Sequence, residues 1–315
     1  MDGGYAQGVA PGKPRVLVLG GTGLVGSRFV GLTADRFDVQ APPHARLDVL
    51  DDAGLNAYLD QTPADAVVNL VACADVDRSE AERGDRDGSV YRVNTTLPGR
   101  LAELCGRRGV YLLHVSTDYV FDGTKDDGPY TEADPPRPLS WYAQTKHEGE
   151  QEVLASGASA SVVRIEMPYS ARWHRKLDFP RLCVTRLRAG TEVLGVIDQR
   201  ITPVFLDDCV EALARVVEQR AQGLLHVAAA DWTTPFDLAQ AVAAALRLDA
   251  SLIRREQFER FATFRPAPRP RHSWLAIEKF EREVGRGVLR GVQESVRAWA
   301  AQLGGRRQAP AAEPR

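Results

Sequence analysis

The stretch Arg15–Gly26, RVLVLGGTGLVG, decides the fold of this chain. Its four apolar residues from Val16 to Leu19 have the length and β-branching of a buried strand. Glycines follow at positions 20, 23 and 26, and apolar residues then recur at helical spacing at positions 24, 25, 29 and 30. A strand, a glycine-rich turn and a helix in this order are typical of the phosphate-binding opening of a dinucleotide-binding fold.

Each glycine of this turn has its own physical role. Gly20 permits a tight turn, Gly23 lets backbone N–H groups approach a pyrophosphate, and Gly26 lets the helix pack close to the strand. Thr22 stands where the second glycine of G-x-G-x-x-G would fall, so the spacing is G-x-x-G-x-x-G. This variant fits the extended type of short-chain dehydrogenases/reductases, although the glycines alone also allow an ordinary glycine-rich βα turn.

The composition bounds the kind of protein. With 315 residues, 44% of them hydrophobic, and a formal net charge of −2, the chain has enough apolar residues for a core and no excess charge for nucleic acid or a membrane surface. No apolar run reaches the ~20 residues of a membrane span, and the first residues lack the apolar core of a signal peptide. The four cysteines are scattered and have no metal-ligand spacing. We therefore expect a cytoplasmic protein with free thiols and no bound metal.

Strands and helices alternate along the first half. Apolar strands are predicted at 37–40, 66–72 and 110–116, with a helix at 94–105 between the last two. This alternation predicts an α/β fold, a Rossmann-type doubly wound parallel sheet with a smaller C-terminal α/β substrate domain. Further helices are predicted at 207–217, 236–246 and 288–303.

The predicted domain boundaries follow the composition. Residues 1–14 and 304–315 are rich in Gly, Pro and Ala and are expected to be flexible tails. Residues 15–170 form the dinucleotide-binding domain, completed by about 200–230. Residues 171–200 and 231–303 are expected to bind substrate. Six basic side chains in the first of these segments either meet a diphosphate or lie on the solvated face of a helix, with Leu182, Val184 and Leu187 beneath: Arg172, Arg175, Lys176, Arg181, Arg186 and Arg188.

The segment after the second predicted strand bears on the cofactor. An acidic residue there hydrogen-bonds the adenosine ribose and repels a 2′-phosphate. Here the chain runs VQAPPHARLD, with no acid directly after Val39 and with His44 and Arg46 nearby. This pattern favours NADP(H) over NAD(H). Asp48 either contacts the adenine or caps the helix that starts near Asp51.

The chemistry is predicted just beyond the strand that ends at Ser116. Thr117 follows directly, and Tyr142 and Lys146 come four residues apart in a helical segment, so they share one face. A lysine ammonium lowers the pKa of a nearby phenol and can hold the nicotinamide ribose. The tyrosine then exchanges a proton with a carbonyl oxygen while hydride passes at carbon, and Thr117 donates a second hydrogen bond to that oxygen.

Several motifs together resemble a known family. GGTGLVG, DAVVNLVACADVDRSE, HVSTDYVFDG and YTEADPPRPLSWYAQTKHEGE are similar to the extended short-chain reductases of the dTDP-4-dehydrorhamnose reductase type. The segment RPRHSWL at 269–275 resembles the C-terminal R-P-x-x-S-x-L signature of that family. The likeness covers roughly residues 15–300.

The resemblance implies roles for the matching positions. Thr117, Tyr142 and Lys146 would be catalytic, and Thr117, Asp118 and Met167 would meet the substrate. Together with Gly20, Thr22 and Gly26 of the turn, the cofactor would contact Gly23, Leu24, Val25, Asp48, Val49, Ala72, Cys73, Ala74, Tyr142 and Lys146. The implied partner is a sugar nucleotide, with NADP(H) as cofactor and a homodimer as the expected assembly. The implied activity is that of an NAD(P)-dependent oxidoreductase acting on the C4 ketone of a deoxysugar.

The sequence departs from the family mainly on the substrate side. Cys73 and Ala74 replace a usual His-Thr pair, and Met167 takes the place of a substrate-contacting tryptophan. Thr202-Pro203 inverts a later Pro-Thr pair. The catalytic residues are intact, so "reductase" is better supported than any particular sugar.

Three other functions are associated with similar folds. A dehydratase is disfavoured because Tyr119 stands where such enzymes carry a glutamate after the aspartate. A sugar-nucleotide 4-epimerase stays open because the same catalytic residues serve it. A non-catalytic NADP-binding subunit also stays open, since the regulatory β subunit of methionine adenosyltransferase resembles this family too.

Overall fold

A parallel sheet of six strands forms the centre of the computed structural model, which describes residues 12–172 and 177–304. The strand order is β2-β1-β3-β4-β5-β7, and every neighbouring pair is parallel, as the sequence predicts. The strands are β1 (Arg15–Leu19), β2 (Asp38–Gln40), β3 (Ala66–Asn69), β4 (Tyr111–Thr117), β5 (Ala160–Ile165) and β7 (Gly223–Val227). β2 lies on one side of β1, and β3 lies on the other side. The strand order therefore reverses at β1, and a crevice is expected at the carboxyl ends of β1 and β3.

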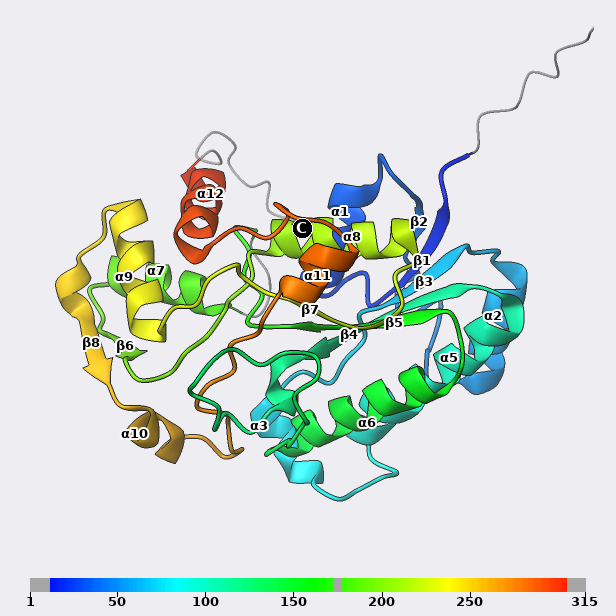
Figure 1. The fold of residues 1–315 in the computed structure, drawn as a ribbon, viewed down its shortest axis with the longest axis horizontal. Helices are drawn as coiled ribbons and strands as arrows, with labels where there is room; N and C mark the ends of the chain where they lie inside the picture. Colours follow the sequence, from blue (N-terminus) through cyan, green and yellow to red (C-terminus); the bar gives the residue numbers. More distant parts are fainter. Residues whose placement is uncertain (1–11, 173–176, 305–315) are drawn as a thin grey trace, which may run out of the picture.

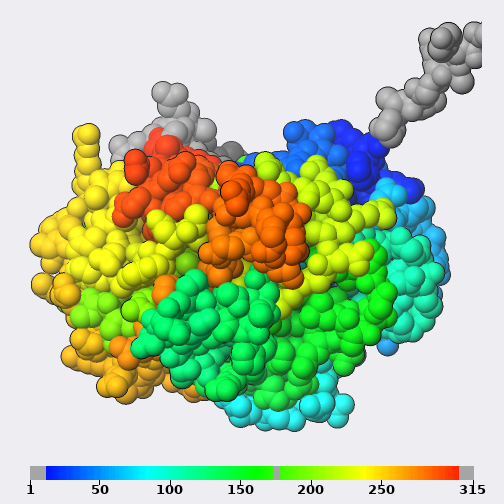
Figure 2. All heavy atoms as spheres, in the orientation of Figure 1, coloured from blue at the N-terminus to red at the C-terminus, as the bar shows by residue number. Residues whose placement is uncertain are grey.

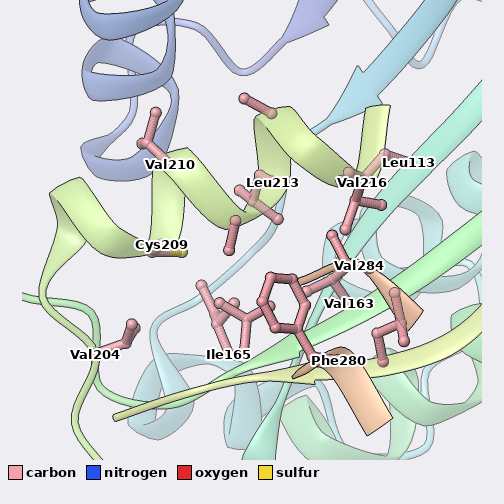
Figure 3. Close-up of a cluster of buried hydrophobic side chains, with 14 of the residues drawn as sticks. Leu113, Val163, Ile165, Val204, Cys209, Val210, Leu213, Val216, Phe280 and Val284 are labelled. Atoms are coloured by element: carbon pink, nitrogen blue, oxygen red, sulfur yellow. The ribbon is translucent and has the colours of Figure 1, made fainter. Parts of the chain in front are cut away.

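Helices cover both faces of this sheet (Figure 1). On one face lie α1 (Leu24–Thr33), α8 (Leu206–Gln219) and α11 (Glu278–Glu283), which share a buried cluster with the strands. Figure 3 shows Leu213 and Val216 of α8 approaching Phe280 and Val284 above the sheet. On the other face lie α2 (Asp52–Gln61), α5 (Leu97–Arg108) and α6 (Trp141–Ala155). Short elements near this second face are α3 (Val76–Ser79), η1 (Glu80–Glu82), α4 (Ser89–Tyr91), the π-helical η2 (Arg92–Thr96) and η3 (Asp118–Val120).

A second, smaller unit surrounds a parallel pair of strands, β6 (Val193–Val196) and β8 (Ile253–Glu256). Its core contains Trp299 and Tyr169, both fully buried, together with apolar residues of its helices. The helices and turns are α7 (Phe179–Arg188), α9 (Pro235–Leu246), η4 (Ala250–Leu252), α10 (Phe258–Thr263) and α12 (Val292–Gly304). Figure 2 shows this unit as the yellow and red end of the molecule, opposite the blue end that holds β1 and β2.

Some boundaries differ from the sequence-based ones. The strand predicted at 66–72 ends at Asn69, because the Asn69 side chain accepts the Val71 N–H in place of a neighbouring strand. The last helix starts at Val292 instead of 288, because the Asp231 carboxylate accepts the Val292 N–H at 2.6 Å. It continues through Gly304, where a tail was expected.

The packing also corrects three expectations. Asp51, not Asp48, is the N-cap residue of α2, and the Asp48 carboxylate instead accepts the Leu50 N–H. Leu182 is exposed on α7, whereas Val184 and Leu187 are buried as expected. α11 packs on the large sheet, although it falls within the segment 231–303 assigned to the substrate domain. The predicted tails otherwise lie outside the described residues.

Two features are absent from residues 12–172 and 177–304. Within them, no helix is both long and apolar enough to cross a bilayer. The same ranges contain no cluster of three or more His, Cys, Asp or Glu side chains arranged to hold a metal ion. All four cysteines are free, and only Cys73 is partly exposed.

Candidate active site

A cleft of about 520 Å³ opens at the carboxyl ends of β1, β3 and β4, the position that the strand order predicts. Its walls come from the start of α1, the end of β4, the start of α6 and the segment leading into α7. The lining residues are Gly23, Leu24, Val25, Gly26, Leu70, Ala72, Ala74, Val76, Val115, Ser116, Thr117, Asp118, Tyr119, Tyr142, Lys146, Ile165, Met167, Pro168, Leu177, Asp178 and Phe179.

The first turn of α1 forms one end of the cleft. Its N-cap residue is Gly23, no side chain caps the helix, and the first turn contains no acidic residue. Gly20 adopts φ +82°, and a Cβ on Gly26 would overlap the carbonyl oxygen of Gly20. The backbone N–H groups of a helix N-terminus bound by such a turn fit a diphosphate, since they combine free donors with positive potential.

Thr117 and Tyr142 meet at the centre of the cleft. Thr117 is the last residue of β4, and Tyr142 is the second residue of α6, whose start is capped by the Ser140 hydroxyl accepting the Ala143 N–H at 3.2 Å. Both residues line the cleft. Burial raises the pKa of Tyr142 above its ordinary value, and the nearby Thr117 hydroxyl opposes that rise in part. The phenol is therefore protonated and ready to donate at neutral pH.

Lys146 lies one helical turn further along α6 and is almost fully buried. Its ammonium donates to the carbonyl oxygen of Val115 at 2.7 Å and lies 3.2 Å from His114 Nε2. Burial lowers the pKa of Lys146 to about 8, while the charge of Glu150 opposes this effect. The sequence suggested that Lys146 would lower the pKa of Tyr142. The net change at Tyr142 is instead upward, because burial dominates and Lys146 is turned toward Val115 and His114.

A buried ion pair joins α6, the helix that carries Tyr142 and Lys146, to strand β5. Glu150 on α6 accepts two hydrogen bonds from Arg164 on β5, at 2.8 and 2.7 Å, and both side chains are at most 2% exposed. Burial alone would raise the pKa of Glu150, but the hydrogen bonds and charge of Arg164 hold it at about 2. The pair fixes α6, and hence Tyr142 and Lys146, against the sheet.

The π-helical segment η2 fixes the wall that follows β3. Asn94 in η2 accepts the Cys73 N–H at 2.9 Å and donates to the Thr145 hydroxyl of α6 at 3.2 Å. Gly149 permits this close approach, because a Cβ there would overlap the carbonyl oxygen of Asn94. Single π-turns of this kind are frequent at functional sites. The contacts hold the end of the β3 segment against α6.

Two buried carboxyl groups lie at the cleft, since Asp118 lines it and Glu166 lies between the lining residues Ile165 and Met167 in the chain. Asp118 is 3% exposed and accepts the Thr117 hydroxyl at 3.0 Å, and Glu166 at the end of β5 is fully buried. Burial raises the pKa of Asp118 to about 7. Burial and the nearby charge of Asp118 raise the pKa of Glu166 well above its ordinary value. The next residue, Met167, adopts φ +37°, a strained conformation for a residue with a side chain.

Most predicted site residues lie in this cleft, but five do not line it. Ala72, Ala74, Thr117, Asp118, Tyr142, Lys146 and Met167 come together there with residues 23–26 of the glycine turn. Gly20 shapes the turn from behind, Thr22 is exposed, and Cys73 points its thiol toward the Ser89 carbonyl. Asp48 and Val49 lie outside the lining of the cleft, and Val49 packs against the part of the core that α2 covers.

The sequence analysis did not single out Glu166, Ser273, His114 or Glu150 as parts of the site. His114, Glu150 and Ser273 lie within the quoted motifs, but nothing in the spacing of these residues shows what they contact. Of the basic residues in 171–200, Arg181 pairs with Asp178 at 2.7 Å and Arg186 donates to the Glu192 carbonyl. Arg175 and Lys176 lie outside the described residues.

The fold and the site together define a class of protein. A parallel sheet with a glycine turn at its crevice, and a threonine beside a Tyr-x-x-x-Lys pair, is the arrangement of a short-chain dehydrogenase/reductase. The chain belongs to the RmlD substrate binding domain family, whose model matches residues 14–304.

Individual relatives agree with this assignment. The dTDP-4-dehydrorhamnose reductase of Mycolicibacterium smegmatis is 32% identical over 300 residues, covering 94% of this chain and 88% of the relative. A dTDP-4-dehydrorhamnose reductase from Clostridium acetobutylicum matches in structure with a TM-score of 0.83 and 25% identity, covering 92% and 99%. One from Bacillus anthracis, solved in complex with NADP, gives 0.84 and 21% identity over 92% and 99%. The β subunit of rat methionine adenosyltransferase 2 is 27% identical over 76% of this chain and 74% of that protein.

Proposed function

We propose that this protein reduces the C4 ketone of a nucleoside-diphosphate 4-keto-6-deoxysugar, with NADPH as the reductant. The observation that carries the proposal is that Thr117, Tyr142 and Lys146 line the same cleft as the uncapped start of α1. One end of this cleft suits a diphosphate and the other presents a protonated phenol. Relatives named dTDP-4-dehydrorhamnose reductase support the choice of substrate class.

The mechanism assigns a separate task to each catalytic residue. When bound, the reduced nicotinamide supplies a hydride to the ketone carbon. Tyr142 donates its proton to the resulting oxygen, and Thr117 orients that phenol and holds the same oxygen by a second hydrogen bond. Lys146 is proposed to hold the ribose of the cofactor. Its anchors, the Val115 carbonyl and His114, keep the ammonium beside α6 for this purpose.

The glycine turn and its neighbours are proposed to hold the cofactor. The diphosphate would lie against Gly23, Leu24 and Val25, and the nicotinamide end would pass Ala72 and Ala74. Asp48 and Val49 would flank the adenine. The Bacillus anthracis relative was solved in complex with NADP, which supports a nicotinamide dinucleotide as the cofactor.

NADP(H) is proposed in preference to NAD(H). β2 ends at Gln40 and is followed by Ala41-Pro42-Pro43, so no carboxylate directly follows the strand. His44 and Arg46 are exposed nearby, and the Arg46 guanidinium lies 6.0 Å from the centre of the Tyr58 ring, which holds it at this edge. A fixed cation there suits a 2′-phosphate.

Arg46→Ala tests this preference. We expect the ratio of kcat/KM for NADPH to kcat/KM for NADH to fall by about tenfold, the effect of ~1.4 kcal/mol. Arg107→Ala, which removes an exposed arginine of α5 that pairs with Glu103, is the control and keeps the ratio. An unchanged ratio in Arg46→Ala contradicts the assignment of the phosphate to this residue.

The substrate is proposed to lie between Asp118 and Met167, with residues 171–200 and 231–303 around its nucleotide. We also propose that the protein works in the cytoplasm as a homodimer, which light scattering of the purified protein tests. The regulatory-subunit and 4-epimerase alternatives have no feature in their favour beyond the shared fold.

The deciding experiment measures oxidation of NADPH with dTDP-4-dehydro-6-deoxy-L-mannose. Tyr142→Phe should lower kcat by about 10²- to 10⁴-fold, because it removes the general acid and leaves the ring in place. Tyr111→Phe is the matched control, since Tyr111 is equally buried and its hydroxyl bonds Ser161 and the Ala221 carbonyl away from the cleft. Tight NADPH binding by the wild type without turnover of this or related 4-keto sugars would overturn the catalytic proposal.

A further inference from the structure

A chain of hydrogen-bond contacts between buried side chains ends at Lys146. The Val71 N–H donates to Asn69 Oδ1 at 3.2 Å, and Asn69 Nδ2 lies 3.1 Å from His114 Nδ1. His114 Nε2 in turn lies 3.2 Å from Lys146 Nζ. The side chains of Asn69, His114 and Lys146 belong to residues that are at most 1% exposed. The position of each proton in this chain therefore follows from the donors and acceptors of the four groups themselves.

The backbone N–H at one end sets the direction of the chain. A backbone N–H only donates, so the side-chain oxygen of Asn69 faces Val71 and the NH₂ group of Asn69 faces His114. This NH₂ group also only donates, so His114 Nδ1 is the acceptor and carries no proton. Burial and the charge of Lys146 lower the pKa of His114 well below its ordinary value, so the ring is neutral. A neutral imidazole has a single N–H, which is then at Nε2 and points toward Lys146.

The two protonation states of Lys146 meet this N–H differently. The amine has a lone pair that accepts from His114 Nε2 while the same nitrogen donates to the Val115 carbonyl oxygen at 2.7 Å. The ammonium has no lone pair, so it places hydrogens against the His114 N–H. The other ring tautomer only moves the conflict, because an Nδ1–H would face the NH₂ group of Asn69. The contact with His114 therefore favours the amine.

Other groups around Lys146 also act on its charge. Burial favours the amine and lowers the pKa of Lys146 to about 8. Glu150 of α6 favours the ammonium, but its carboxylate is already paired with Arg164 of β5 at 2.7 Å. Tyr142 of α6 is protonated and neutral, and Asp118 of η3 acts on that phenol. The charged form of Lys146 thus has only a shared carboxylate in its favour.

We propose that His114, oriented by Asn69, is a positioning residue that lowers the affinity of Lys146 for a proton, so that binding of the cofactor draws a proton from water onto Lys146 Nζ. The idea rests on the proposed function, which assigns Lys146 to the cofactor ribose. Lys146 lines the cleft, and the ribose hydroxyls would accept from its ammonium and offset the unfavourable contact with His114. The proton from water forms the new N–H bond, and no other bond changes.

The affinity for the cofactor should therefore depend on pH. Because the charged form of Lys146 holds the ribose, binding is strongest below the pKa of Lys146 in the free protein and weakens as the pH rises through that value, near 8. We expect the Kd for NADPH to rise about tenfold between pH 7 and pH 9. Titration calorimetry in two buffers of different ionisation enthalpy should show proton uptake on binding, increasing over the same range.

Asn69→Asp reverses the direction of the chain with almost no change in shape. The carboxylate keeps an acceptor for the Val71 N–H and presents a second acceptor to His114 Nδ1. The ring proton should then move to Nδ1, and Nε2 should accept from the ammonium of Lys146. In this variant we expect the Kd for NADPH to stay constant within twofold from pH 7 to pH 9 and the proton uptake to disappear.

Asn56→Asp is the matched control. Asn56 of α2 hydrogen-bonds Arg108 and Asp60, and it does not line the cleft. This variant introduces the same carboxylate without touching His114, so it should keep the pH dependence of wild type. Thermal unfolding confirms that each variant is folded.

Nitrogen NMR of histidine-labelled protein without cofactor reads the ring tautomer directly, with His114→Gln assigning the signals. The His114 proton should be on Nε2 in wild type and Asn56→Asp, and on Nδ1 in Asn69→Asp. A proton on Nδ1 in wild type would overturn the proposal, and so would a Kd for NADPH in wild type that does not change between pH 7 and pH 9. If both results are as expected but no 4-keto sugar is reduced, the proposed function fails and the role of His114 stands.

Discussion

The two ends of the cleft are built in different ways. The proposed cofactor end is one contiguous stretch, residues 20–26. Backbone groups would contact the cofactor there, and the glycines permit the close approaches that the turn requires. The proposed substrate end draws on distant parts of the chain, because Asp118 lines the cleft and Glu166, next to the lining residues Ile165 and Met167, accepts hydrogen bonds from Thr202 and Ser273. A backbone site depends on local sequence and can be recognised in it. A side-chain site depends on packing, and its residues can change without altering the fold.

Glu150 of α6 and Arg164 of β5 form a buried ion pair that holds the cleft wall against the sheet. Breaking this pair should have the largest effect on the stability of the protein. Glu150→Gln is expected to lower the free energy of unfolding by about 3–5 kcal/mol, because it leaves the Arg164 charge buried and unpaired. Denaturant unfolding at pH 7 measures this loss. The exposed pair Arg254–Glu192 is the control, since Glu192→Gln should change the free energy by less than about 1 kcal/mol.

The same pair predicts a dependence of stability on pH. The pKa of Glu150 is depressed in the folded state to about 2, so its contribution is full above the unfolded-state value of about 4.3. It should be lost as the pH falls from there toward 2. Wild type should therefore lose stability over this range more steeply than Glu150→Gln, and parallel acid-unfolding curves for the two proteins would contradict the assignment.

At the cofactor end, Gly26→Ala should weaken NADPH binding with little effect on the rest of the molecule. The added Cβ overlaps the Gly20 carbonyl, so the turn must shift, at a cost of about 1–3 kcal/mol. Titration calorimetry with NADPH measures the change in Kd. Gly31→Ala on the same helix is the matched control, because the Cβ there meets only an ordinary contact at 3.5 Å. Equal effects of the two variants would show that the turn has no special role.

At the substrate end, Met167→Ala should act on substrate binding and spare the cofactor. Met167 lines the cleft, and loss of its apolar contact is expected to raise KM for the sugar nucleotide by about tenfold, equivalent to ~1.4 kcal/mol. The Kd for NADPH should not change. Leu194→Ala, at an exposed position of β6, controls for general loss of apolar surface. A change in the Kd for NADPH in place of a change in KM would contradict the placement of Met167 at the substrate end of the cleft.

Much of this architecture was visible in the sequence. The alternation of strands and helices predicted the parallel sheet, and the glycine turn predicted the crevice, because both depend on residues close together in the chain. The start of α9 was predicted to within one residue for the same reason, since the Thr234 hydroxyl accepts the Asp237 N–H three residues on. The start of α12 was not, because it depends on Asp231, some sixty residues away from the segment that its periodicity describes.

The sequence by itself determined the fold, the glycine turn and the candidate triad of Thr117, Tyr142 and Lys146, since local spacing and hydrophobic pattern carry that information. Only the tertiary structure decided which charges are buried and what they touch. It turned Lys146 toward Val115 and His114, paired Glu150 with Arg164, and brought the Ser273 hydroxyl to Glu166. Ionisation depends on burial and on through-space neighbours, and no spacing along the chain records either of them.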